Sequence, residues 1–72
     1  MKAVEVHNLD DPELAQFVER SREELFNLRF QHATGQLENT ARLRQAKTDL
    51  ARGLTVARQR GLDVENEIRK QQ

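Results

Sequence analysis

The sequence contains no cysteine, tryptophan or tyrosine, only one proline and three glycines, and only three phenylalanines among its 72 residues. Without cysteine there is no disulfide, thiolate catalysis or cysteine-ligated zinc site, and two isolated histidines do not form a closed metal site. No apolar run approaches the roughly 20 residues that a membrane span needs, and Met1 to Leu9 lacks the pattern of a signal peptide. We therefore expect a soluble intracellular protein with no cofactor, no metal and no membrane partner.

The length of the chain bounds its function as well. One small domain over residues 1–72 fits this length, and so short a chain rarely encloses a substrate pocket. Adjacent carboxylates such as Glu23 and Glu24 point to different sides of a helix, so they do not form an acid–base pair. The sequence contains no glycine-rich phosphate loop and no nucleophile elbow. We expect no enzymatic activity and no small-molecule substrate.

The first of two helical segments begins at an acidic cap. The chain between its glycines and its proline is rich in the strong helix formers Glu, Arg, Gln, Leu and Ala. Asp10 can accept a hydrogen bond from the amide of Glu13, and Pro12 is tolerated in a first turn. Gly35 can take the left-handed conformation that ends helices. These signals predict a helix over about 10–33.

The second helical segment follows a short turn, at about 34–39. Asn39 is the next good cap and Gly61 the next stop signal, which predicts a helix over about 40–60. A connection this short makes the two helices antiparallel neighbours. The tail 61–72 can be a further helical turn or two, or disordered, and the sequence leaves this open.

Apolar and small side chains recur at spacings of three and four residues in both segments, which predicts one seam between the helices. The fold class is therefore all-α: a long antiparallel two-helix hairpin, similar to a coiled coil, with a short N-terminal arm. The seam is thin, so we expect the hairpin to be marginally stable alone and completed by a larger partner. The predicted seam residues are Leu14, Phe17, Val18, Ser21, Leu25, Leu28 and His32 on the first helix and Leu43, Ala46, Leu50, Gly53, Leu54 and Ala57 on the second.

Phe26 and Phe30 fall outside this seam, on the flank of the first helix. One interpretation is that apolar residues of the N-terminal arm or of the turn fold over the two rings. The other is that the rings form a docking surface for protein or RNA. The candidate covering residues are Val4, Val6, Leu9 and Leu37.

Charge is unevenly distributed along the chain. Twelve basic and twelve acidic residues give a net charge of zero, yet residues 1–24 carry −4, residues 25–60 carry +5 and residues 61–72 carry −1. The central segment has too few acids to pair with its cations along its own helices. Arginines, threonines and glutamines recur on the outer side of the second helix, where they suit phosphate and sugar oxygens, although a solvated helix face has the same composition. This pattern favours a polyanion held through one oriented face.

Two segments of the chain closely resemble the signature of the bacterial large-subunit ribosomal protein family numbered twenty-nine. They are ELFNLRFQ at 24–31 and ATGQLEN at 33–39. The second helix is similar to that family at RLRQ (42–45), Lys47, DLAR (49–52) and Thr55-Val56. The resemblance covers about Leu9 to Gly61.

The resemblance implies a structural constituent of the large ribosomal subunit, in the cytoplasm, that binds large-subunit ribosomal RNA near the polypeptide exit tunnel and takes part in translation. It implies the large-subunit ribosomal protein numbered twenty-three as a neighbour, with nascent-chain chaperones and the signal recognition particle as visitors. Gly35 would set the turn, and Phe26 and Phe30 are candidate protein contacts. On matching positions, the implied RNA contacts are Asn27, Arg29, Gln31, Gln36, Asn39, Arg42, Arg44, Gln45, Lys47, Arg52 and Thr55.

Three residues depart from the family's pattern. The family usually has a second basic residue where this chain has Thr48, a branched apolar residue at Gly53 and a larger aliphatic at Ala57. We therefore expect a thinner seam and a greater dependence on RNA than in a typical relative. The alternative function is a small antiparallel coiled-coil adaptor that pairs with a protein through the seam or through Phe26 and Phe30, but an adaptor does not require a basic segment with so few acids.

Overall fold

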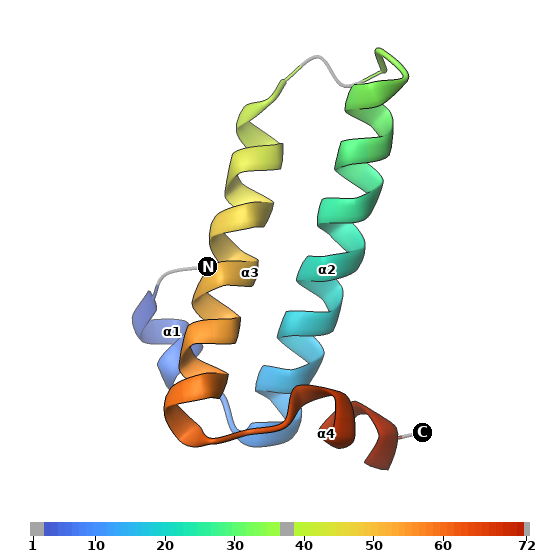
Figure 1. Cartoon of the computed structure of the whole chain (residues 1–72). Coiled ribbons are helices and arrows are strands. Elements are labelled where there is room, and N and C mark those ends of the chain that lie inside the picture. Colours follow the sequence, from blue (N-terminus) through green and yellow to red (C-terminus); the bar gives the residue numbers. More distant parts are fainter. Residues whose placement is uncertain (1–2, 37–38, 72) are drawn as a thin grey trace.

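Two long helices dominate the structure. The computed structural model describes residues 3–36 and 39–71, and the described residues contain no strand. In Figure 1, α2 and α3 lie side by side and antiparallel, which confirms the all-α hairpin. At the end away from the turn, α1 lies against α3 and α4 lies against α2. The helices are α1 (Ala3–His7), α2 (Asp11–Ala33), α3 (Ala41–Arg60) and α4 (Val64–Lys70).

The two ends of this hairpin differ, so each is named here by its residues. We call the part nearest the turn, residues 25–36 and 39–50, the turn half. The remaining described residues, 3–24 and 51–71, form the base half, which includes both short helices.

The local signals that end the long helices act as predicted. The Asp10 carboxylate accepts a hydrogen bond from the Glu13 amide at 2.8 Å and so caps α2. Gly35 and Gly61 have φ angles of 77° and 69°, in the left-handed region that glycine adopts without strain. Each follows the end of a long helix, so glycine terminates both.

The start of α3 differs slightly from the prediction. Its N-cap position is Thr40, whose side chain makes no cap hydrogen bond, and the helix begins at Ala41. The Asn39 side chain still accepts a hydrogen bond from the Ala41 amide at 2.9 Å. Asparagine bonds the amide two residues ahead in this way in many turns, so Asn39 does the capping from one position further out.

The main hydrophobic cluster lies in the base half and draws on all four helices. Because α1 and α4 cover the seam there, Val56 and Ala15 are also buried, although neither belongs to the predicted seam. The tail that the sequence leaves open forms α4, which contributes Val64. The buried members of this cluster are Val6, Leu14, Ala15, Val18, Val56, Ala57 and Val64.

The N-terminal segment forms the short helix α1 and does not cover the phenylalanine rings. Val6 is fully buried in the base cluster, whereas Phe26 and Phe30 are 70% and 62% exposed. The interpretation that the arm covers these rings is therefore wrong. The physical reason is that Val6 buries more apolar surface in the cluster that contains Val56 than it could on the flank of α2. Leu37, the other candidate cover, lies outside the described residues.

The turn half has a much thinner core. Only Leu25, Leu28 and Ala46 form its buried cluster, with Leu43 and Leu50 packed against them. His32, predicted to lie in the seam, is exposed, and that prediction is wrong. The reason is that α3 begins at Ala41 and Leu43 is its first residue in this cluster, so no seam residue of α3 extends as far as His32.

At Gly53, side chains of α2 pack directly against the backbone of α3. A Cβ atom at this position would lie 2.8 Å from Val18 Cγ2 and 3.1 Å from Phe17 Cδ1. A real Cβ atom tolerates no contact as short as the first, and Val18 is fully buried with a stiff β-branched side chain. The ring of Phe17 thus packs where a larger residue at position 53 would otherwise stand.

Because of this contact, we predict that replacing a glycine inside a helix with alanine destabilises the protein, which is the opposite of the usual effect. Alanine normally stabilises a helix by about 1 kcal/mol relative to glycine, but overpacking costs about 1 to 3 kcal/mol. We expect Gly53→Ala to lower the melting temperature of the chain, measured by far-ultraviolet circular dichroism. In a Val18→Ala background, which removes the shortest contact but leaves that of Phe17, the same change should lower the melting temperature less. A higher melting temperature for Gly53→Ala alone would contradict the packing described here.

Candidate nucleic-acid interface

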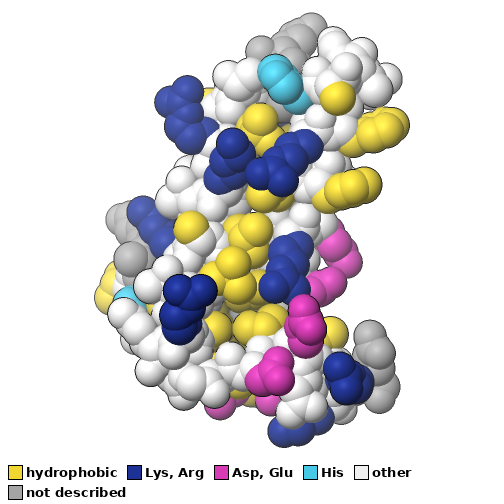
Figure 2. Space-filling model, in the orientation of Figure 1, with side chains coloured by type: hydrophobic (Ala, Val, Ile, Leu, Met, Phe, Trp, Pro, Cys, Tyr) yellow, Lys and Arg dark blue, Asp and Glu magenta, His cyan; other side chains and the backbone are white. Residues whose placement is uncertain are grey.

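Cations without acidic partners gather in the turn half. The side chains of Arg29, Arg42, Arg44 and Lys47 are exposed and make no hydrogen bond or ion pair with another described residue. Figure 2 shows Lys and Arg side chains along the whole length of the visible face, and Asp and Glu side chains only in its middle and lower parts. These four cations outnumber the one described acid of the turn half, Asp49, and they supply a concentrated positive field.

Three cations of the base half, by contrast, are used within the protein. Arg60 pairs with Asp11 at the start of α2 and donates a hydrogen bond to the carbonyl oxygen of His7 at 2.8 Å. It therefore joins the end of α1 to the start of α2. Arg60 therefore contributes to the basic segment in sequence but not to a binding surface. The ion pairs are Arg60 with Asp11 (3.3 Å), Arg22 with Glu19 (3.8 Å) and Lys70 with Glu67 (3.9 Å).

The predicted contacts do not share one face of the hairpin. Asn27, Gln31 and Arg42 line a shallow groove of about 410 Å³ between α2 and α3. Arg29 lies two residues from both Asn27 and Gln31, so it points about 160° away around the helix. The predicted contacts of α2 therefore lie on opposite sides of this helix and do not form one face, while binding through a single oriented face stays a prediction.

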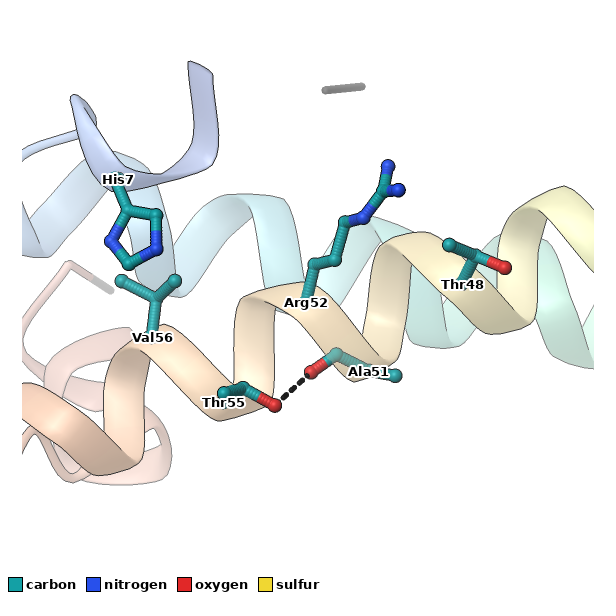
Figure 3. A pocket seen from close by; sticks show the side chains of 6 residues that line it. All are labelled: His7, Thr48, Ala51, Arg52, Thr55 and Val56. Carbon is teal, nitrogen blue, oxygen red and sulfur yellow. Dashed lines mark hydrogen bonds between the residues drawn. The ribbon is translucent and has the colours of Figure 1, made fainter. Parts of the chain in front are cut away.

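A second concavity, of about 340 Å³, lies between α1 and the outer side of α3 (Figure 3). Figure 3 shows His7 above Val56 and the Arg52 side chain extending away from α3. The Thr55 hydroxyl donates to the Ala51 carbonyl at 2.8 Å. The pocket is lined by His7, Thr48, Ala51, Arg52, Thr55 and Val56.

Several predicted contacts already use their polar groups within the chain. The Gln45 amide donates to Asp49 at 3.2 Å, and the Asn39 side-chain oxygen accepts from Ala41. The Thr55 hydroxyl donates its only proton to the carbonyl oxygen of Ala51. Arg52 is half-buried and interacts with other residues of the chain. These side chains are less available to an outside partner than the four cations of the turn half, and Gln36 is exposed at the turn.

One concavity was not anticipated by the sequence pattern. A hollow of about 360 Å³ beside Phe26 is lined by Arg22, Glu23, Phe26 and Asn27. Arg22 and Glu23 belong to the acidic first third of the chain, which gave no sign of a binding role. Their spacing around Phe26, at three and four residues, was the available signal, since residues so spaced are neighbours on a helix.

The described residues offer little for other chemistry. None of their His, Asp and Glu side chains form a group of three or more that could hold a metal ion. No described helix is both long enough and apolar enough to cross a membrane.

Known proteins resemble this chain along most of its length. Residues 4–60 match the family described as "Ribosomal L29 protein", and α4 follows the matched residues. The chain is 56% identical over 62 residues to "Large ribosomal subunit protein uL29" of Geobacillus stearothermophilus, covering 86% of this chain and 94% of that protein. The protein of the same name from Brevibacillus brevis is 56% identical over 64 residues, with 89% and 98% covered. That from Maridesulfovibrio salexigens is 55% identical over 62 residues, with 86% and 97% covered.

The division between paired and unpaired cations can be tested by comparing Arg60 with Arg58. Arg58 is an exposed neighbour on α3 that makes no hydrogen bond or ion pair with another described residue. Arg60→Gln should lower the free energy of unfolding by about 1 to 2 kcal/mol, mostly through the charged hydrogen bond to His7. Arg58→Gln should change it by less than about 0.5 kcal/mol. Equal effects in urea unfolding would show that Arg60 does not hold the base together.

Proposed function

The chain belongs to the ribosomal L29 protein family, and we propose that it binds large-subunit ribosomal RNA through the turn half of its hairpin, near the polypeptide exit tunnel. As a member of this family it is a structural constituent of the large ribosomal subunit and acts in translation in the cytoplasm. The family implies a structural and not a catalytic role.

The observation that carries the RNA proposal is the group of four unpartnered cations over a thin core. Arg29, Arg42, Arg44 and Lys47 lie where only three side chains are buried and where Asp49 is the one described acid. The turn half therefore has few counterions and little packing of its own. Phosphates supply the missing anions, and their contacts position a protein on RNA without reading its sequence. Binding would complete this half of the hairpin from outside.

The shape of the molecule supports contact with RNA on both sides. The hairpin is a slab whose principal extents are 37 × 27 × 14 Å. Arg29 lies on one side of α2, while Asn27 and Gln31 lie on the other, beside Arg42. A slab this thin with polar groups on both faces can sit between two segments of folded RNA, recognising their shape.

The base half suits a different neighbour. Three of its cations, Arg22, Arg60 and Lys70, form ion pairs within the chain, and its acids outnumber its cations by ten to seven, so it presents no net positive charge to RNA. We expect this half to face solvent or protein, which agrees with a position beside the ribosomal protein numbered twenty-three. The resemblance also implies that nascent-chain chaperones and the signal recognition particle bind nearby, and this stays a prediction.

The salt dependence of RNA binding tests this function. We expect the full chain to bind large-subunit ribosomal RNA transcribed in vitro with an affinity that falls steeply as salt rises, because bound cations displace counterions. Arg44→Gln and Lys47→Gln should each reduce the slope of log affinity against log salt by about 0.7 to 0.9. The control, Arg58→Gln in the base half, should leave the slope unchanged.

Two results would contradict the proposal. Absence of RNA binding, or a slope near zero, would remove the phosphate contacts altogether and favour the coiled-coil adaptor. A slope that falls equally in Arg44→Gln and Arg58→Gln would show that the positive charge acts without regard to its position on the hairpin.

A further inference from the structure

Phe26 and Phe30 have no role in the hairpin itself. They are 70% and 62% exposed, and neither contributes to either hydrophobic cluster of the described residues. In Figure 2, apolar side chains project from the edge of the molecule along the upper part of α2. Two exposed rings on one edge of so small a protein indicate a surface that something else covers.

The spacing of the two rings suits nucleic-acid bases. Phe26 and Phe30 are four residues apart on α2, so their backbone positions differ by a rise of about 6 Å along the helix. In a stack of bases, adjacent bases lie about 3.4 Å apart, so the two bases on either side of a given base lie roughly 7 Å apart. Both rings are exposed, so each is available for stacking by a base of the same strand.

The hollow beside Phe26 carries groups that match the edge of a base. Glu23 and Asn27 line it, and neither side chain makes a hydrogen bond with another described residue. Arg22, the remaining polar lining residue, is held by its ion pair with Glu19. A carboxylate repels phosphate but accepts hydrogen bonds from base amino groups, and an amide both donates and accepts.

Charge favours RNA over a protein as the occupant of this edge. Arg29 lies between the two phenylalanines in the sequence and has no partner among the described residues. An aromatic surface next to unneutralised cations is the combination that binds unpaired nucleic-acid strands, with bases on the rings and phosphates on the cations. A protein neighbour would account for the exposed rings but not for the unpaired cation Arg29 beside them.

We propose that the α2 edge binds an unpaired segment of RNA, with bases stacked on Phe26 and Phe30 and one base in the hollow contacted by Glu23 and Asn27. This inference rests on the proposed function, since it requires that the chain binds large-subunit RNA. The carboxylate of Glu23 selects a base with an exposed amino group, such as cytosine or guanine.

The first test measures the affinity of the full chain for large-subunit ribosomal RNA transcribed in vitro. Phe26→Ala and Phe30→Ala should each weaken binding about 5- to 150-fold, the range for losing one stacked base, with no change in salt slope because no charge is removed. Phe26→Leu should lose less, since it keeps the apolar volume. Val4→Ala is the control, because Val4 is 64% exposed on α1, away from this edge.

The sign of a change at Glu23 gives a second test on the same RNA. If Glu23 accepts a hydrogen bond from a base, Glu23→Gln weakens binding, whereas a carboxylate that only repels phosphates gives tighter binding when it is neutralised. Chemical probing of the RNA should show unpaired bases that the wild type protects and that become reactive with Phe26→Ala but not with Val4→Ala.

The outcomes separate this inference from the proposed function. Wild-type protein that fails to bind the RNA overturns the function and the inference with it. Normal RNA affinity and protection in Phe26→Ala and Phe30→Ala, or tighter binding by Glu23→Gln, overturn the inference alone. Variants that keep RNA affinity but fail to enter the large subunit would assign the α2 edge to a protein neighbour, which also overturns it.

Discussion

The close approach of α2 to α3 at Gly53 is the contact on which the base of the hairpin depends. With no side chain at that position, Val18 and Phe17 pack directly over the backbone of α3. The helices are then near enough for Val6 of α1 and Val64 of α4 to reach the same cluster. A two-helix hairpin leaves its seam open on both sides, and the two short helices cover it in the base half.

Most of the buried apolar side chains lie in the base half, which leaves the turn half with a small core. The base half has its own core and pairs three of its cations, whereas the turn half buries only Leu25, Leu28 and Ala46 and carries four exposed cations with one described acid. Stability and binding are therefore assigned to different halves of one small molecule. Under the proposed function, the folded base would hold the turn half in shape while RNA would supply counterions and packing to this half.

Features that depend on near neighbours in the chain were predictable. The cap at Asp10, the glycine stops at 35 and 61, and the pairing of α2 with α3 each follow from residues a few positions apart. The short helices were not, because α1 and α4 are stabilised by contacts with residues distant in the sequence, as Val6 is by Val56. For the same reason the exposure of His32, Phe26 and Phe30 required the structure.

The sequence by itself determined the family, the helical hairpin and the position of the basic segment, since these are encoded in residue identities and short spacings. Which cations of that segment are available was decided only by the tertiary structure. Arg60 meets Asp11, 49 residues away, because the chain folds back on itself, while Arg44 meets no described acid. Coulomb interactions depend on separation in space, and a sequence states only separation along the chain.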